Sequence, residues 1–312
     1  MSLPVHFAPL QGYTDRVYRC VHAKVFGGID TYYTPFIRFE KEGFRSKDLK
    51  DIEPEENVAI PVVPQLIAAT PNEFRSIATL FIEKGYRCAD INLGCPFPMQ
   101  VRLHRGAGML PYSDEIACLL DTIHEFPQLA FSLKMRLGWN CETDVFRLLP
   151  LLKEYPLTHI TLHPRIGTQQ YKGNVDLDSF SLFYETCPVP LFYNGDLYSL
   201  IDFHSITERF PRLAGLMSGR GLLAKPWLAM EYSSGQPLSA GEVKERLREF
   251  HRLLQDEYSI RLEGGEHQVL SKMKTVWDYL LPDAEKKLRK KVVKSSSLQV
   301  YNRAVSDLLD SL

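Results

Sequence analysis

Residues 89–96 read Ala-Asp-Ile-Asn-Leu-Gly-Cys-Pro, which places a cysteine thiol where a short apolar strand gives way to a turn. The strand ends at Asn92, the chain turns at Gly94, and Cys95 follows directly. A thiol between glycine and proline is not explained by helix or strand packing, and it can serve as a nucleophile or as an acid. The alternative is a small buried residue in a turn, since free cysteine is among the most buried residue types.

Residues able to bind a ligand also stand at the ends of other apolar runs, namely Gln11, Gln65, Lys134, Arg136, His163, Arg165, Asn194, Asp196 and Arg220. Lys134 is the most informative, because a lysine within a strand is expensive to bury without a partner. Each of the others has an ordinary structural explanation in isolation, such as a turn signal for 194–196. Their joint occurrence at successive strand ends indicates one shared site.

Two of these strand ends predict a phosphate site. They read Asn194-Gly195-Asp196 and Gly219-Arg220-Gly221. Glycines expose backbone N–H groups, and Arg220 adds a forked cationic donor. In α/β barrels the loops after strands seven and eight often bind phosphate. Lys134 could then stabilise negative charge on an electron-rich ring, as the N1–C2=O edge of a reduced flavin requires.

The elements that must position these residues alternate regularly. We expect strands at 5–9, 29–36, 62–66, 88–94, 131–137, 159–164, 190–196 and 215–220. Helices are expected at 15–26, 71–85, 113–125, 142–155, 176–185 and 200–210, and 38–60 reads as an exposed loop region. Eight alternations predict a (β/α)8 TIM barrel, in which catalytic groups sit at the carboxyl ends of the strands. A doubly wound sheet is the alternative, but its usual Gly-rich phosphate turn after strand one is absent.

The chain changes character after residue 230. Ser239 and Glu242 match a capping box, and only helical periodicity follows to residue 312. We therefore expect a barrel over 1–232, a boundary in the Ser-Ser-Gly-Gln-Pro stretch at 233–237, and a smaller all-helical domain over 239–312. Within it lies a basic cluster, Lys286, Lys287, Arg289, Lys290, Lys291 and Lys294. It is either a solvated helix face or a surface for a phosphate backbone.

Composition limits the remaining classes. The formal net charge of −1 over 312 residues argues neither for nor against a nucleic-acid partner. The six cysteines form no Cys-x-x-Cys pair, which disfavours a structural metal site and indicates reduced thiols in the cytoplasm. No signal peptide is recognisable, and no apolar run approaches the ~20 residues that span a bilayer. The simple expectation is a monomer without metal or membrane partner.

The ordered motifs resemble those of the tRNA-dihydrouridine synthases. They are Ala-Pro-Leu-Gln-Gly-Tyr-Thr-Asp at 8–15, Gln65, Asp-Ile-Asn-Leu-Gly-Cys-Pro at 90–96, Gly-Ala-Gly at 106–108, Lys-Met-Arg-Leu-Gly at 134–138, His-Pro-Arg at 163–165, Gln-Tyr-Lys-Gly at 170–173, Asn-Gly-Asp at 194–196 and Gly-Arg-Gly at 219–221. The helical C-terminal segment also fits that family's two-domain layout, so the resemblance covers nearly the whole chain.

The resemblance implies an enzyme that holds FMN in the barrel mouth, takes electrons from NADPH and passes a hydride to C6 of a D-loop uridine in tRNA. It implies that Cys95 is the general acid that protonates C5, and that Asn92 and Arg136 face the base. The implied FMN contacts are Pro9, Leu10, Gln11, Gln65, Lys134, His163, Asn194, Gly195, Asp196, Gly219 and Arg220. Lys274 and the basic cluster are the candidate tRNA contacts.

The chain departs from the family pattern beside the cysteine. The family usually has Lys-Val a few residues after Gly-Cys-Pro, whereas residues 97–101 are Phe-Pro-Met-Gln-Val and the spacer to Gly106 is about two residues longer. Leu10 and Gln11 stand where Met is common. Two rivals remain open: an FMN barrel that acts on a free pyrimidine, such as a dihydroorotate or dihydropyrimidine dehydrogenase, and a non-enzymatic RNA-binding protein with a vestigial barrel.

Overall fold

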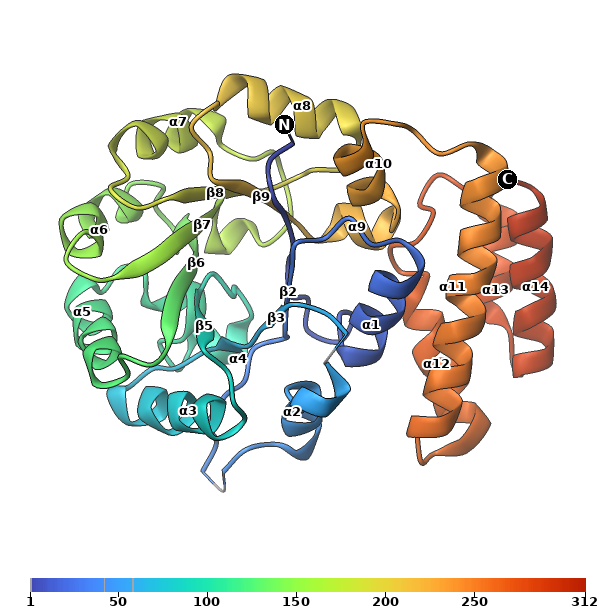
Figure 1. Ribbon diagram of the computed structural model, residues 1–312, viewed down its shortest axis with the longest axis horizontal. Coiled ribbons are helices and arrows are strands. Elements are labelled where there is room, and N and C mark those ends of the chain that lie inside the picture. Colours follow the sequence, from blue (N-terminus) through green and yellow to red (C-terminus); the bar gives the residue numbers. More distant parts are fainter. Residues whose placement is uncertain (1, 42, 58) are drawn as a thin grey trace.

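A parallel sheet closed into a barrel forms the centre of the computed structural model, which describes residues 2–41, 43–57 and 59–312 (Figure 1). All of its strand pairs are parallel, in the order β3-β2-β1-β9-β8-β7-β6-β5-β4. The strands are β1 Val5–Phe7, β2 Thr31–Tyr33, β3 Val62–Val63, β4 Gln65–Leu66, β5 Cys88–Leu93, β6 Ala130–Gly138, β7 Leu157–Ile166, β8 Leu191–Asn194 and β9 Gly215–Ser218. The predicted TIM barrel is confirmed.

The barrel closes through one short segment. The strand expected over 62–66 is present as two, β3 and β4, because Pro64 lies between them and has no N–H to give to a ladder. β3 pairs with β2 on one side, and β4 pairs with β5 on the other. The Pro64 carbonyl still accepts the N–H of Asp90 at 2.9 Å. Nine named strands therefore occupy the eight positions that the sequence predicts.

Six helices predicted between the strands lie around the outside of the barrel (Figure 1). They are α1 Arg16–Val25, α3 Pro71–Glu83, α5 Ser113–Asp121, α6 Asp144–Leu152, α7 Leu177–Thr186 and α8 Leu200–Arg209. Their starts follow local chemistry: the Asp15 side chain accepts the N–H of Tyr18, and Thr70 caps α3 directly before Pro71. The predicted helix limits agree to within a few residues.

Several short elements are absent from the sequence prediction. The region 38–60, expected to be irregular, contains the helix α2 Ser46–Asp51 and a 3₁₀ turn at Pro54–Glu56. Tertiary contacts hold this region in place: the buried Arg19 guanidinium donates to the Asp51 carbonyl at 2.8 Å and to Asn57 at 3.0 Å. The others are α4 Pro98–Val101, the 3₁₀ turns Gly106–Met109 and Gly167–Gln169, α9 Arg220–Ala224 and α10 Leu228–Ser234, while the predicted helix 113–125 ends in a 3₁₀ turn at Thr122–Glu125.

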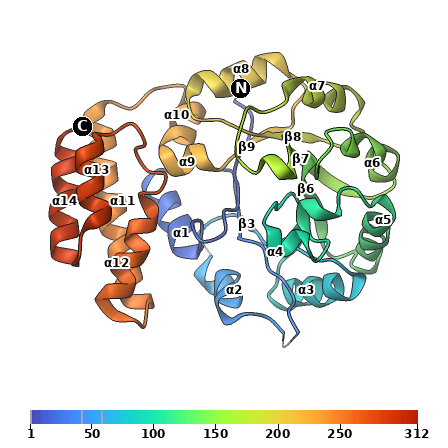
Figure 2. The same ribbon diagram turned by 180° about the vertical axis from the view of Figure 1, so that it is seen from behind.

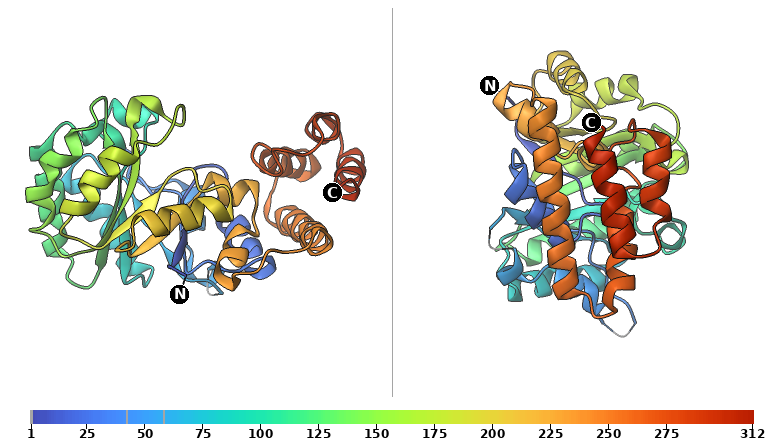
Figure 3. Two further views of the ribbon diagram at one scale, coloured as in Figure 1. Left: turned by 90° about the horizontal axis from the view of Figure 1, so that it is seen from above. Right: turned by 90° about the vertical axis from the view of Figure 1, so that its right-hand side faces the viewer.

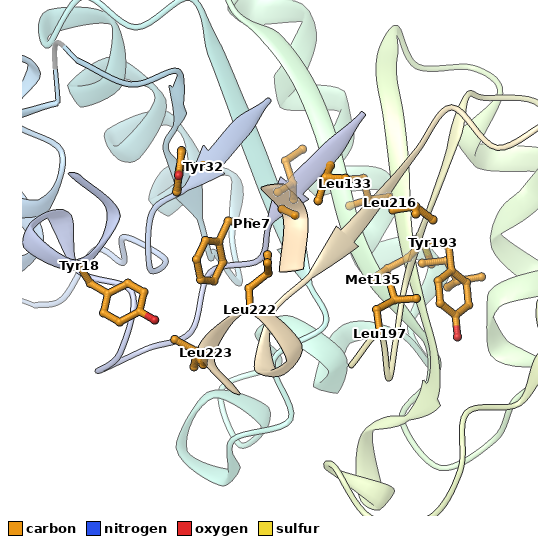
Figure 4. Packing of buried hydrophobic residues seen from close by; sticks show 14 of the residues in the cluster. Phe7, Tyr18, Tyr32, Leu133, Met135, Tyr193, Leu197, Leu216, Leu222 and Leu223 are labelled. Atoms are coloured by element: carbon orange, nitrogen blue, oxygen red, sulfur yellow. The ribbon is translucent and has the colours of Figure 1, made fainter. Parts of the chain in front are cut away.

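The apolar core fills the space between the strands and the outer helices. Figure 4 shows Phe7 beside Tyr32, with Tyr18 of α1 facing them, and the ring centroids of Phe7 and Tyr18 are 6.1 Å apart. Along β6 the alternation is strict, since Leu133 and Met135 belong to this core. Lys134 and Arg136 therefore point to the other face of the strand, into the barrel.

Four helices form the C-terminal part: α11 Ala240–Arg261, α12 Gly265–Val276, α13 Lys286–Lys294 and α14 Leu298–Asp310. The predicted capping box is present, because Ser239 and Glu242 each satisfy the other's backbone N–H. Figure 3 shows these helices as a bundle beside the barrel, with α11 next to α1. Phe250 of α11 packs on Tyr18 and Phe26 of the barrel. No helix within the described residues is long and apolar enough to cross a membrane.

Candidate active site

A cavity of about 830 Å³ opens at the carboxyl ends of the strands, the end over which α4 lies in Figure 2. The volume falls in the ordinary range for small-molecule sites. The structure brings nearly all the predicted site residues to its wall: Pro9, Leu10, Gln11, Gln65, Asn92, Cys95, Lys134, Arg136, His163, Asn194, Gly195, Asp196, Gly219 and Arg220. Lys274 is the exception. It lies on α12, where its ammonium donates to the Ser295 carbonyl, and does not line the cavity.

The turn that carries Cys95 is fixed from both sides. The Asn92 side-chain oxygen accepts the N–H groups of Gly94 at 3.0 Å and Cys95 at 2.9 Å. The Cys95 carbonyl accepts the N–H of Ala107 at 3.0 Å. Gly106 has φ +60°, and a Cβ there would lie 2.7 Å from the Cys95 oxygen. The Gly-Ala-Gly motif therefore supports the cysteine by close backbone approach.

Burial raises the pKa of the Cys95 thiol, against the opposing effects of the Phe97 N–H and of Arg136, Lys134 and Arg38. The group is therefore a protonated thiol at neutral pH. A protonated thiol can donate a proton, whereas a nucleophile must be a thiolate. Residues 89–96 left two chemical roles open for Cys95, a nucleophile and an acid. The raised pKa favours the acid.

Lys134 crosses the barrel interior from β6 to β8. Its ammonium donates to the Asn194 side-chain oxygen at 2.8 Å, and the Asn194 amide nitrogen donates to the Met217 carbonyl at 2.7 Å. Burial, and after it the charge of Arg136, lowers the pKa of Lys134 to about 8. No described carboxylate lies within salt-bridge distance of this ammonium. The site therefore offers a fixed cation to an anionic group.

Arg136 is anchored beside the Cys95 turn. Its Nε donates to the Gly94 carbonyl at 2.9 Å, and its Nη1 donates to the Ile166 carbonyl at 3.0 Å. The guanidinium lies 5.4 Å from the centre of the Tyr171 ring. Both strand and turn thus hold this side chain in one orientation, with its remaining donors available at the cavity wall.

His163 and Asp196 are oriented by Arg165, a strand-end residue to which the family resemblance assigned no cofactor contact. The Arg165 Nη1 donates to His163 Nε2 at 3.0 Å and to Asp196 at 3.0 Å. Since a guanidinium only donates, His163 Nε2 is an acceptor and its Nδ1 carries the proton. Burial, followed by the nearby cations, lowers the pKa of His163 well below its usual value, so the ring is neutral. Arg220 also donates to Asp196, at 2.8 Å.

The glycines of the predicted phosphate site are places of close packing. A Cβ at Gly219 would lie 2.9 Å from a Leu10 methyl carbon, and one at Gly195 would lie 2.8 Å from Val175. The bare backbone there adjoins Arg220 at the cavity wall. Together with the ammonium of Lys134 and the Nδ1–H of His163, this donor set fits a phosphorylated cofactor with an electron-rich ring. No described group of three or more His, Cys, Asp or Glu could hold a metal ion.

Sequence reasoning missed part of the wall. Arg38, Arg45 and Lys47 come from the region after β2, and Phe97 and Met99 come from the turn into α4. Phe97 and Met99 are each 57% exposed, although both are large and apolar. The available signal was position: 38–60 follows the carboxyl end of a barrel strand, where loops build the site. Tyr171, Tyr198 and Tyr279 complete the wall on other loops.

The helical part reaches the cavity through Tyr279. This ring meets Tyr13 edge-on at 4.9 Å, and the Tyr13 hydroxyl donates to Asp278 at 3.0 Å. Lys272 donates to the Gly12 carbonyl at 2.8 Å. The loop after β1 is therefore shared between the cavity and the C-terminal helices, an arrangement that no local sequence pattern predicts.

The basic cluster divides into two kinds of residue. Five lysines are exposed on α13: Lys286, Lys287, Lys290, Lys291 and Lys294. No described carboxylate forms a salt bridge with them. Arg289 is different, because its guanidinium is half-buried and donates to the Trp277 carbonyl at 2.5 Å. Arg289 has a structural role, and the five lysines are the part of the cluster that faces solvent.

Comparison with known proteins gives two kinds of similarity. The family model described as dihydrouridine synthase (Dus) matches residues 6–311. The tRNA-dihydrouridine(16) synthase of Pseudomonas putida is 27% identical over 278 residues, covering 84% of this chain and 85% of the relative. The tRNA-dihydrouridine synthase B of Escherichia coli (strain K12) is 26% identical over 267 residues, covering 80% of each.

Similarity to solved structures concerns the fold alone. Morphinone reductase in complex with tetrahydroNAD matches with a TM-score of 0.54 at 10% identity, covering 77% of this chain and 89% of the other. The old yellow enzyme from Trypanosoma cruzi matches with a TM-score of 0.51 at 11% identity, covering 75% and 89%. Both alignments stop short of the whole chain and agree with a barrel that carries an additional segment.

Proposed function

Because this chain belongs to the dihydrouridine synthase family, whose members are flavin-dependent oxidoreductases, we propose that it reduces the C5–C6 bond of a D-loop uridine in tRNA. The observation that carries the proposal is the common cavity of Cys95 and Lys134. One offers a thiol whose pKa is raised by burial, and the other offers a buried ammonium. A proton donor and an anion-stabilising cation are the two groups that addition of hydrogen across a polarised double bond requires.

The proposed cofactor is FMN, with NADPH as the reductant. When bound, FMN supplies the electrons of the reaction as a hydride to C6 of the base. Lys134 stabilises negative charge at the ring edge, and Arg220 with the backbone of Gly195 and Gly219 binds the phosphate. The remaining proposed contacts are Pro9, Leu10, Gln11, Gln65, His163, Asn194 and Asp196.

The proposed substrate enters the cavity as a single base that has left its stack, because an enzyme cannot reach C5 and C6 within stacked RNA. Asn92 and Arg136 bind the base edge, and Cys95 delivers its proton to C5. The resulting thiolate is disfavoured by burial, so it regains a proton from solvent before the next turnover.

The proposed division of labour follows the two parts of the chain. Residues 1–232 form the catalytic barrel, and residues 239–312 form a helical tRNA-binding domain. The five exposed lysines of α13 supply phosphate contacts, with Lys274 as a further candidate. The enzyme works as a monomer in the cytoplasm, where free cysteines persist. An enzyme that acts on a free pyrimidine would not need such a lysine surface. This surface therefore favours a tRNA substrate over a free pyrimidine.

The test is a map of dihydrouridine in bulk tRNA from cells that lack the protein. Loss at one D-loop position, restored by the wild type and not by Cys95→Ala, is the expected result. Purified protein should be yellow, with a flavin spectrum that NADPH bleaches. An unchanged map, together with turnover of free pyrimidines by the purified flavoprotein, would contradict the tRNA substrate and favour the small-molecule rival.

A further inference from the structure

Asp90 lies inside the barrel, below the cavity, on the same face of β5 as Asn92. It is fully buried and does not line the cavity. Its Oδ2 accepts Nε2 of Gln65 at 2.6 Å, and its Oδ1 accepts the hydroxyl of Ser132 at 2.6 Å. Burying a carboxylate is costly unless it is paired and hydrogen-bonded. Asp90 forms no salt bridge within the described residues, and none of the steps proposed above uses it.

The hydrogen bonds above Asp90 run in one direction. Gln65 turns its nitrogen to Asp90, so its Oε1 faces Asn92 and accepts Nδ2 at 2.7 Å. Asn92 thereby turns its own oxygen to the N–H groups of Gly94 and Cys95. An amide side chain has two nearly equal orientations, and only its partners decide between them.

The group at each end of this chain of hydrogen bonds can act only as a donor or only as an acceptor. An ionised carboxylate only accepts, and a backbone N–H only donates. Burial raises the pKa of Asp90 to about 6, which leaves it ionised at pH 7. Between these ends, each of the two amides has one orientation that satisfies all its neighbours. Gln65 and Asn92 line the cavity but are only 0% and 8% exposed, so little water is available to replace a wrong partner.

We propose that Asp90 is a positioning residue that sets the orientation of the Gln65 and Asn92 amides and, through them, the conformation of the Cys95 turn. It acts through Gln65 and Asn92 and does not itself reach the cavity. The inference rests on the proposed function only in giving Cys95 a catalytic use, because the hydrogen-bond directions hold whatever the substrate is.

The variant Asp90→Leu tests this, because it keeps the branched shape and removes both acceptor oxygens. Gln65 Nε2 then has no acceptor at position 90. If Gln65 rotates, its nitrogen faces the Asn92 nitrogen, and rotation of Asn92 sets a donor against the N–H of Cys95, so one donor is left unpaired between position 90 and the turn. Asp90→Asn alone is a control, because its oxygen can accept Gln65 Nε2 while its nitrogen donates to the Ser132 hydroxyl.

A compensating pair of substitutions tests the contact between positions 65 and 90. In Asp90→Asn/Gln65→Glu the nitrogen at position 90 donates to a carboxylate at position 65, whose other oxygen still accepts Asn92 Nδ2. The oxygen at position 90 still accepts the Ser132 hydroxyl. The Gln65→Glu single variant instead places two carboxylates at the 2.6 Å contact and is expected to be worse than the double variant. Ser132→Ala is the matched control, because it removes one bond to Asp90 without reversing any amide.

The measurement is the rate of Cys95 alkylation by iodoacetamide against pH, read by peptide mass spectrometry on the full-length purified flavoprotein. A loosened turn exposes the thiol and lowers its pKa, so Asp90→Leu is expected to react at least about fivefold faster at pH 7. Asp90→Asn, Ser132→Ala and the double variant are expected to stay within about twofold of wild type. Turnover of tRNA by Asp90→Leu is expected to fall in kcat with little change in KM.

The comparison of Gln65→Glu with the double variant decides the outcome even where Asp90→Leu folds poorly. The double variant must then be better folded and less reactive at Cys95 than Gln65→Glu alone. A double variant that is no better than Gln65→Glu would overturn the inference, as would a wild-type alkylation profile in folded Asp90→Leu. If Cys95→Ala retains tRNA turnover while the alkylation cycle behaves as expected, the proposed acid is wrong and the role of Asp90 stands.

Discussion

The ammonium of Lys134 and the side-chain oxygen of Asn194 are 2.8 Å apart across the barrel interior. This hydrogen bond joins β6 to β8 at the cavity wall and satisfies one of three ammonium donors. The other two are left for whatever fills the cavity. A residue prepared for a ligand in this way is expected to lower the stability of the empty protein.

Lys134→Met is therefore expected to stabilise the cofactor-free protein. The pKa of Lys134 is about 8 in the fold and 10.5 ordinarily, so the unfolded chain binds more protons between these values. The contribution of Lys134 to the free energy of unfolding is therefore lowest at neutral pH and rises across pH 8–10.5. We expect a gain of on the order of 2 kcal/mol at pH 7 that shrinks toward pH 10, measured by denaturation.

Flavin affinity of Lys134→Met is expected to fall in the same preparations. The exposed Lys172, substituted to Met, is the control and should change neither quantity. A loss of stability in apo Lys134→Met at pH 7 would show that the lysine is a structural residue.

Replacement of the proposed acid separates the two half-reactions. Cys95→Ala is expected to reduce dihydrouridine formation by at least about a hundredfold, while NADPH still bleaches the flavin at the wild-type rate. Stopped-flow absorbance measures the first half-reaction and nucleoside mass spectrometry the second. Cys187→Ala, at a half-buried cysteine at the end of α7, is the matched control. Full turnover by Cys95→Ala would exclude the proton-donor role.

Substitution of Gly106 by alanine is expected to cost more stability than its positive φ alone explains. A Cβ there would lie 2.7 Å from the Cys95 oxygen and 2.9 Å from its Cβ. Gly85 has a similar positive φ of +81° but open space around it. Gly85→Ala should cost about 1 kcal/mol, and Gly106→Ala at least twice that with loss of turnover. An equal decrease in Tm in the two variants would show that the Cys95 turn accommodates a Cβ at position 106 without loss of stability.

The exposed lysines of α13 are expected to act through charge alone. Lys287→Gln/Lys291→Gln should weaken tRNA binding and lower the slope of log affinity against log salt by about one for each phosphate that is no longer neutralised. Flavin reduction should stay unchanged. Lys153→Gln/Arg209→Gln, on the outer side of the barrel at α6 and α8, is the control of equal charge. An equal slope change in both would indicate that the whole surface, and not α13, binds the RNA.

The strand ends were predictable because their signals are local. Apolar runs of a few residues followed by glycine or a polar residue identify β5, β8 and β9 directly from the sequence. A barrel then brings those ends to one mouth, so Cys95 and Lys134 could be placed together from the sequence alone. The sequence did not predict that the strand over 62–66 divides at Pro64. The division depends on which neighbouring strand each half pairs with, and no local pattern shows that.

The rest of the cavity wall depends on contacts distant in sequence. Arg45 and Lys47 reach it because Arg19 binds the carbonyl at Asp51 and so holds α2 in place. Tyr279 reaches it because the helical part docks on the loop after β1. Neither placement has a periodic or compositional signal. The orientation of the Gln65 and Asn92 amides is likewise invisible in sequence, since it follows from three-dimensional neighbours.

The loop from Leu10 to Asp15 contacts both the cavity and the C-terminal helices. Leu10 and Gln11 line the cavity, while Asp15 accepts the Tyr258 hydroxyl at 2.9 Å and pairs with Lys272 at 2.8 Å. A loop ordered by one partner costs less to order for the other, and such coupling is reciprocal by thermodynamic necessity. If the C-terminal helices bind tRNA as proposed, cofactor binding and tRNA binding are therefore expected to favour each other through this loop. Protein without flavin is then expected to bind tRNA more weakly than the flavoprotein.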